Sequence, residues 1–155
     1  MSQDRLKARV SSVRPIGVYM LNGHELKFHK IGRDGSAKCD ASFTGSDKDV
    51  IEGVVFEIDP GEVAGLDLTE GVGKGYEKKL VIVTNTQGDT IEAFSYVATT
   101  IDDSLQPFTW YKTHVLIGAR NAGLSAQYIF RIESLKAIKD LNQERERSEL
   151  IIYEQ

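Results

Sequence analysis

The sequence is short of several features, and each shortage argues against a class of protein. Cys39 is the only cysteine among 155 residues, so no disulfide can form within the chain. Such sparse cysteine is typical of a reducing compartment, and we expect a cytoplasmic protein. No stretch approaches the roughly 18 apolar residues of a membrane-spanning helix, and MSQDRLKARV lacks the apolar core of a signal peptide. We expect no membrane association.

Clusters of positive charge and of metal-binding side chains are also missing. Nineteen Lys and Arg face 23 Asp and Glu, a formal net charge of −4, whereas phosphate binding needs clustered basic residues. The sequence therefore argues against a nucleic-acid partner. His24, His29 and His114 are scattered, without a helical pair or convergent carboxylates, so we expect no metal site. Cys39 lacks a recognisable histidine partner, and a buried thiol is expected.

What is present fits a single α+β domain over residues 1–155. Apolar runs predict strands, and Asn22-Gly23 is a strong signal for a hairpin between the first two. Strands come first and helices later, without βαβ alternation, which predicts a small mixed or antiparallel barrel-like sheet with flanking helices. The strands are expected at 16–21, 25–31, 39–43, 49–59 and in a hairpin at 77–99 that turns at 86–89; the helices are expected at 2–10, 59–70, 107–121, 125–138 and in the charged run 143–149.

The stretch LDLTEGVGKGYE ends a short helix with a glutamate and then spaces three glycines. Asp59 can cap this helix, with Glu62 completing a capping box. Val63, Leu66 and Glu70 then share one face, and Leu68 and Val72 are expected to crowd the carboxyl further. A carboxyl partly withdrawn from water in a concave pocket suits proton transfer near neutral pH. The alternative is a solvated glutamate, or one paired with Lys74.

Gly71, Gly73 and Gly75 do not form a phosphate loop, because no strand precedes them and no helix follows. The glycines are instead expected to let the backbone reverse sharply and pass close to another group.

Several stretches together resemble the gamma-glutamylcyclotransferase-like family, which has the AIG2-like fold. They are FHKIGRDGSAKCD, GVVFEID, LDLTEGVGKGYEKKLVIV, AFSYVA and PFTWYKTHVLIGARNAGLSAQYIFRIESL. The resemblance implies a small β-barrel with surrounding helices. It also implies acyl transfer in glutathione-related metabolism: members cyclise gamma-glutamyl amines or peptides, releasing 5-oxoproline and the freed amine.

This chemistry implies a single carboxylate, which takes a proton from the substrate α-amine and returns one to the leaving nitrogen. The resemblance gives that role to Glu70, and it implies no cofactor, because the folded substrate already holds its nucleophile beside the carbonyl. It further implies substrate contacts from Gly71, Gly75, Tyr76, Tyr96 and Tyr111. For Tyr111 a core position with one satisfied hydroxyl is the favoured alternative.

The family's Tyr-Gly-Ser-Asn-type loop is not in this sequence. In related chains the pattern M-S-x-x-R-L-x-x-R follows that loop, and here Met1-Ser2 begins the same pattern with Arg5 and Arg9. An uncovered sheet edge would then favour a homo-oligomer. Two alternatives to the enzyme stay open: a non-catalytic relative that serves as a binding or structural domain, and an interaction domain in which Glu70 is incidental.

Overall fold

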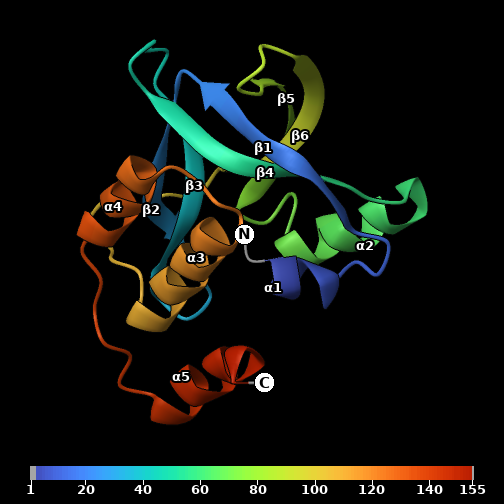
Figure 1. The fold of residues 1–155 in the computed structure, drawn as a ribbon. Helices are drawn as coiled ribbons and strands as arrows, with labels where there is room; N and C mark the ends of the chain where they lie inside the picture. The colour runs from blue at the N-terminus through green and yellow to red at the C-terminus, as the bar shows by residue number, and fades with distance from the viewer. Residues whose placement is uncertain (1–2, 155) are drawn as a thin grey trace.

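The computed structural model describes residues 3–154. Within that range the chain forms six strands and five α-helices, ending in a short 3-10 turn (Figure 1). In chain order they are α1 (Gln3–Lys7), β1 (Arg14–Asn22), β2 (His24–Ile31), β3 (Ala37–Phe43), β4 (Val50–Glu57), α2 (Pro60–Glu70), β5 (Tyr76–Thr84), β6 (Thr90–Ala98), α3 (Thr109–Asn121), α4 (Ala126–Ser134), α5 (Gln143–Leu150) and η1 (Ile151–Tyr153).

The strands form two antiparallel sheets with helices beside them, which confirms the α+β class. One sheet has the order β4-β1-β5-β6 and the other consists of β2 and β3. β5 pairs with β6 along its whole length, but it meets β1 at Met20 and Thr84 alone. The sheets approach each other where the Asp40 carboxylate on β3 accepts the Ala98 N–H at 2.7 Å. The strands therefore curl around a shared interior without forming a closed ring of paired neighbours.

The hairpin predicted at Asn22-Gly23 is wrong. β1 pairs with β4 and β2 pairs with β3, so the chain leaves one sheet and enters the other at this dipeptide. Gly23 adopts φ 70°, and its N–H donates to the Asp49 carbonyl at 2.8 Å. The dipeptide does make the sharp turn that its composition favours, but β4 and not β2 pairs with β1.

The short helix α2 begins and ends where the sequence indicates. Asp59 accepts the Gly61 N–H at 2.7 Å, and Gly71 ends the helix in the left-handed conformation with φ 79°. The expected capping box does not form, because Glu62 instead accepts N–H groups from Ser11 and Ser12, each at 3.0 Å. These bonds tie the segment after α1 to the start of α2.

The two main apolar clusters lie on either side of the sheets. Around α1 and α2 the buried members are Leu6, Val10, Val13 and Leu66. Between α3 and α4 they are Ala119, Tyr128 and Ile132. The expectation that Leu68 crowds Glu70 is wrong, since Leu68 is 81% exposed on the outer face of α2.

The helix predicted at 125–138 is shorter than expected. α4 ends at Ser134, and Leu135 is extended with ψ 134°. Ile138 then pairs beside Phe108, where its N–H donates to the Pro107 carbonyl at 2.9 Å. This return contact explains the early end, because the chain must double back along the segment that precedes α3.

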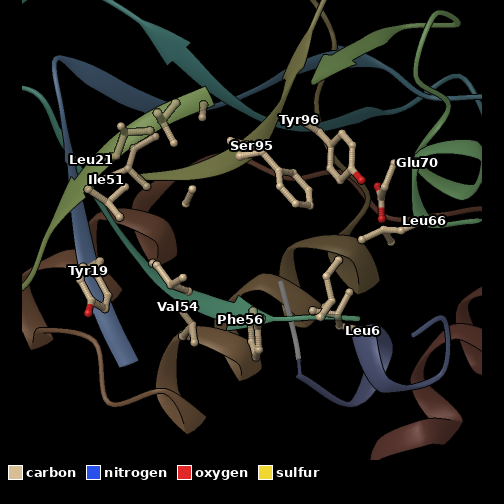
Figure 2. A pocket seen from close by; sticks show the side chains of 18 residues that line it. Leu6, Tyr19, Leu21, Ile51, Val54, Phe56, Leu66, Glu70, Ser95 and Tyr96 are labelled. Atoms are coloured by element: carbon tan, nitrogen blue, oxygen red, sulfur yellow. The ribbon is translucent and has the colours of Figure 1, made fainter. Parts of the chain in front are cut away.

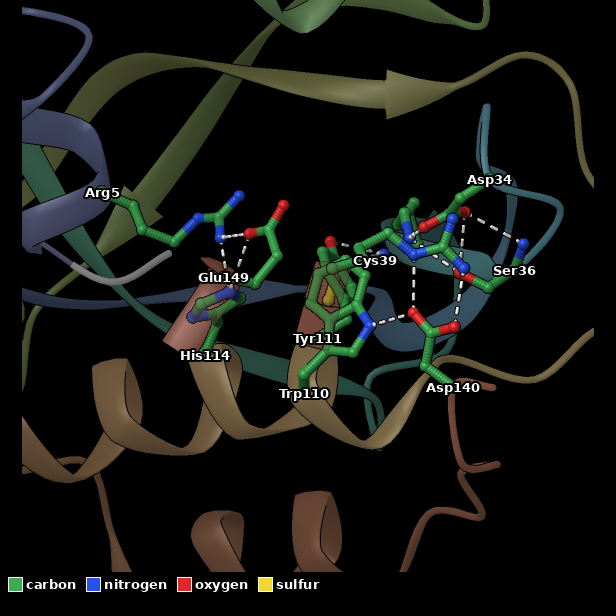
Figure 3. A network of polar contacts seen from close by, with 11 residues as sticks. Arg5, Asp34, Ser36, Cys39, Trp110, Tyr111, His114, Asp140 and Glu149 are labelled. Carbon is green, nitrogen blue, oxygen red and sulfur yellow. Dashed lines mark hydrogen bonds and ion pairs between the residues drawn. The ribbon is translucent and has the colours of Figure 1, made fainter. Parts of the chain in front are cut away.

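Helix α5 has no buried residue and is held by polar contacts (Figure 3). The buried Asp140 carboxylate accepts the Trp110 indole N–H at 2.8 Å and two Arg145 guanidinium N–H groups at 2.6 and 2.7 Å. Nearby, Glu149 pairs with Arg5 on α1 at 2.6 Å. No helix among residues 3–154 is long and apolar enough to cross a membrane.

Candidate active site

Glu70 is the last residue of α2, and the local turn holds it in place. The Gly71 N–H donates to the carbonyls of Asp67 and Leu68 at 3.0 and 3.2 Å. This cap ends the helix at the glutamate. Leu66, one turn earlier on the same face, is 5% exposed. The Glu70 side chain is consequently largely enclosed, with 13% of its surface exposed.

A cavity of about 260 Å³ lies between the strands beside this carboxylate. In Figure 2, Glu70, Leu66 and Tyr96 lie at one end, while Tyr19 and Ile51 lie at the other. Strands β1, β4, β5 and β6 supply most of the wall. The carboxyl thus lies at the edge of a partly open, mostly apolar pocket, and its position on the helix predicts such a place.

Glu70 does not stand alone, because Arg9 faces it. The Arg9 guanidinium donates to the Glu70 carboxylate at 2.5 Å, and its own side chain is 28% exposed. We did not identify Arg9 from the sequence as a site residue. The sequence feature that could have identified Arg9 was its place in the R-L-x-x-R pattern. Lys74, the expected alternative partner of Glu70, makes no such pair.

Tyr96 lies on β6 and also lines the cavity. Its hydroxyl donates to the Asp67 carboxylate at 2.7 Å, and Lys78 pairs with the same carboxylate at 2.6 Å. Burial and the neighbouring Asp67 charge raise the pKa of the Tyr96 hydroxyl. Tyr96 is therefore a neutral hydrogen-bond donor held beside Glu70.

Tyr76 and Tyr111 meet at one residue of β3. The Tyr76 hydroxyl donates to the Cys39 carbonyl at 2.8 Å, while the Tyr111 hydroxyl accepts the Cys39 N–H at 3.0 Å. Burial raises the pKa of both hydroxyls and raises that of the Cys39 thiol to about 11. Both tyrosines support β3 in this state, and the protonated thiol is a poor nucleophile.

The glycine turn brings Lys30 into the site. Gly71, Gly73 and Gly75 all have positive φ, and a side chain at Gly75 would come within 3.1 Å of the Lys30 Cε atom. The Lys30 ammonium lies over the Tyr76 ring at 4.8 Å. Burial first, then the charges of Arg33 and Lys38, lower the pKa of Lys30. This close approach is the contact that the glycine spacing predicted, and it adds a second cation near Glu70.

The structure brings some predicted site residues together and separates others. Glu70 and Tyr96 line the cavity, and Gly71 adjoins Glu70. Gly75 and Tyr76 lie by Lys30, whereas Tyr111 lies on α3, behind Cys39. Among residues 3–154 no three His, Cys, Asp or Glu side chains are grouped to hold a metal ion.

Three comparisons with known proteins bear on this site. The model of a family described as AIG2-like matches residues 50–132, a span that includes Glu70. A search of curated protein sequences finds no match. Among solved structures, a gamma-glutamyl cyclotransferase superposes with a TM-score of 0.87 at 22% identity, over 99% of this chain and 93% of the other.

Two further solved structures share the fold. An uncharacterized human protein superposes with a TM-score of 0.86 at 23% identity, over 98% of this chain and 92% of its own. The Bacillus subtilis protein YkqA gives 0.71 at 20% identity, over 86% of this chain and 49% of its own. At these identities the likeness establishes the fold.

Proposed function

Since this chain belongs to the AIG2-like family, we propose that it is a gamma-glutamylcyclotransferase-type enzyme acting on a small gamma-glutamyl amine or peptide. The observation that carries the proposal is the enclosed Glu70 carboxylate at the edge of a cavity, oriented by Arg9. A carboxylate in such a position can both accept and return a proton.

In the proposed reaction Glu70 first removes a proton from the substrate α-ammonium group. The freed α-nitrogen attacks the γ-carbonyl carbon, which forms the five-membered ring. Glu70 then gives its proton to the leaving nitrogen, and the bond between that nitrogen and the carbonyl carbon breaks. The ring nitrogen still carries a second proton, which Glu70 passes to the released amine, so that the amine leaves as an ammonium. All substrate atoms appear in 5-oxoproline and the released amine. Ring closure within one molecule gains its rate from proximity.

The site also offers partners for the charged glutamyl head. Arg9 and Lys30 are cations on the Glu70 side of the cavity, and we assign the substrate α-carboxylate to them. The turn at Gly71 and Gly75 leaves room for the backbone to approach the substrate. Tyr96 is the proposed hydroxyl contact. Tyr76 and Tyr111 are proposed to act on substrate binding indirectly, because their hydroxyls hold β3 at Cys39.

One observation favours a second candidate. The Arg9–Glu70 ion pair already satisfies the carboxylate, as expected for a non-catalytic relative that keeps the cavity as a binding or structural domain. In that case Glu70 would hold α1 against α2 and move no proton.

The test is incubation of the protein with gamma-glutamyl dipeptides and measurement of released 5-oxoproline. We expect turnover that Glu70→Gln lowers by about 100-fold or more, because the amide keeps the shape without the transferable proton. Glu77→Gln, which alters an exposed glutamate paired with Lys79, is the matched control and should stay active. A folded protein without turnover, or a fully active Glu70→Gln variant, would reject the enzyme assignment for Glu70.

A further inference from the structure

The cavity beside Glu70 has an unusual wall for a site that handles an amino acid derivative. Among residues 3–154, Glu70 is the only charged residue that lines it, and the other polar side chains there are the hydroxyls of Tyr19, Ser95 and Tyr96. The remaining lining residues are apolar or glycine: Leu6, Leu21, Ala41, Ile51, Gly53, Val54, Val55, Phe56, Ile58, Leu66, Val81, Val83, Ala93 and Phe94.

Charge decides which half of a gamma-glutamyl substrate can enter this space. The glutamyl head carries an ammonium and a carboxylate, and burying either without a partner is costly. The cations Arg9 and Lys30 are not part of the wall, so the head must stay at the Glu70 edge. The group attached through the scissile nitrogen is then the half that points inward.

Size is consistent with that arrangement. The volume of about 260 Å³ is many times the roughly 10–15 Å³ that a cavity needs to hold one water molecule. A pocket with such an apolar lining favours small apolar molecules.

We propose that the cavity binds the leaving amine, and that this amine carries an uncharged aliphatic or aromatic group. The inference rests on the proposed function for the reaction, but the binding of the amine itself does not require turnover. The substrate class is therefore a gamma-glutamyl amide of an apolar amine, in preference to one of a charged or very small amino acid.

Gly53 offers a way to fill the cavity without touching Glu70. It pairs with Tyr19 across β1 and β4, and directly opposed residues share one sheet face. A Cβ atom at Gly53 would meet no atom within 4 Å, so Gly53→Leu can place its side chain in the cavity. Gly65→Leu is the matched control, since Gly65 has equal room but is exposed on α2. Ala93→Leu provides a second filling variant at another point of the wall.

The kinetic test compares gamma-glutamyl-n-butylamide and gamma-glutamylbenzylamide with gamma-glutamylglycine and the gamma-glutamyl isopeptide of the lysine ε-amine. We expect kcat/KM to be at least about tenfold higher for the two apolar amides. Gly53→Leu or Ala93→Leu should remove that preference by lowering kcat/KM for the two apolar amides at least about tenfold. Gly65→Leu should keep the preference.

A binding test separates the two claims. Benzylamine should raise the melting temperature of the unsubstituted protein and not that of Gly53→Leu, whereas glycinamide, a cation of equal charge, should raise neither. Binding of this kind without any 5-oxoproline release would support the cavity assignment and reject the proposed reaction. Turnover with equal kcat/KM for all four substrates would overturn the cavity assignment and leave the proposed reaction standing. Benzylamine binding that Gly53→Leu and Ala93→Leu both leave unchanged would also overturn it.

Discussion

The Arg9 guanidinium donates to the Glu70 carboxylate at 2.5 Å, which joins the turn after α1 to the end of α2. This contact holds the carboxylate of the proposed base in one orientation. Arg9→Ala should therefore lower kcat/KM for 5-oxoproline release about tenfold or more, and Arg9→Lys should restore part of the loss. Arg14→Ala, which removes an exposed partner of Glu57, is the control. Unchanged kinetics in Arg9→Ala would show that the pair does not orient Glu70 for catalysis.

His114 should make folding sensitive to mild acid. Burial first, then the neighbouring Arg5 charge, lower its pKa from 6.5 to about 4. The imidazole accepts from Arg5, and its other nitrogen lies 2.8 Å from the Tyr153 hydroxyl. The folded protein resists protonation of His114 while the unfolded chain does not. His114 therefore does not lower the free energy of unfolding above pH 6.5. As the pH falls from 6.5 toward 4, the free energy of unfolding declines, by roughly 3 kcal/mol at most.

Urea unfolding at several pH values measures this loss. His114→Gln, which keeps a donor and an acceptor but does not titrate, should flatten the profile between pH 6.5 and 4.5. His24→Gln, at a histidine bonded to the Asn22 carbonyl on the surface, is the control. The pKa of Glu149, the other titrating group against His114, is lowered, so its effect comes at lower pH. A profile that His114→Gln leaves unaltered would contradict the assignment.

Asp140 anchors the C-terminal segment. Its side chain is buried and accepts hydrogen bonds from Trp110, Arg145 and the Asn142 N–H. Asp140→Asn removes the charge opposite Arg145, and we expect a loss of about 2–4 kcal/mol in the free energy of unfolding. Glu57→Gln, in an exposed pair with Arg14, should cost less than about 1 kcal/mol. Equal losses in the two variants, measured by denaturant titration, would argue against a buried anchor.

Any side chain at Gly75 should lower the stability of the protein. Its φ of 120° is rarely adopted by other residues, and a Cβ atom would lie 3.1 Å from the Lys30 Cε atom and 3.3 Å from its Nζ atom. Gly75→Ala should destabilise the protein by about 1–2 kcal/mol and displace Lys30 from the Tyr76 ring. Gly65→Ala, on the exposed face of α2, should instead stabilise by up to about 1 kcal/mol. Thermal unfolding should show a lower melting temperature for Gly75→Ala and a higher one for Gly65→Ala.

Local patterns predicted most of the helices and strands. The β5–β6 hairpin pairs from Tyr76 with Ala98 to Thr84 with Thr90, and only Tyr76 lies outside the predicted span, by one residue. α2 has the predicted cap at Asp59, and its glutamate lies on the side of the buried Leu66. These features depend on neighbours a few residues away, which is why periodicity and capping residues indicate them.

Long-range pairing was harder to predict. Asn22-Gly23 favours a turn, but local geometry does not say that β1 will prefer β4 as its neighbour. Arg9 and Glu70 are 61 positions apart, and the sequence contains several other arginines that could equally pair with Glu70. The meeting of Tyr76 and Tyr111 at Cys39 likewise depends on three separate elements.

By itself the sequence determined the α+β class, the ends of α2, the glycine turn and the place of Glu70 on the side of the buried Leu66, because short-range backbone preferences and side-chain periodicity control them. The tertiary structure alone decided which strands pair, that Arg9 faces Glu70, and which residues line the cavity beside the carboxylate. Those outcomes follow from competition among distant surfaces for burial and hydrogen bonds, and no local pattern records the result of that competition.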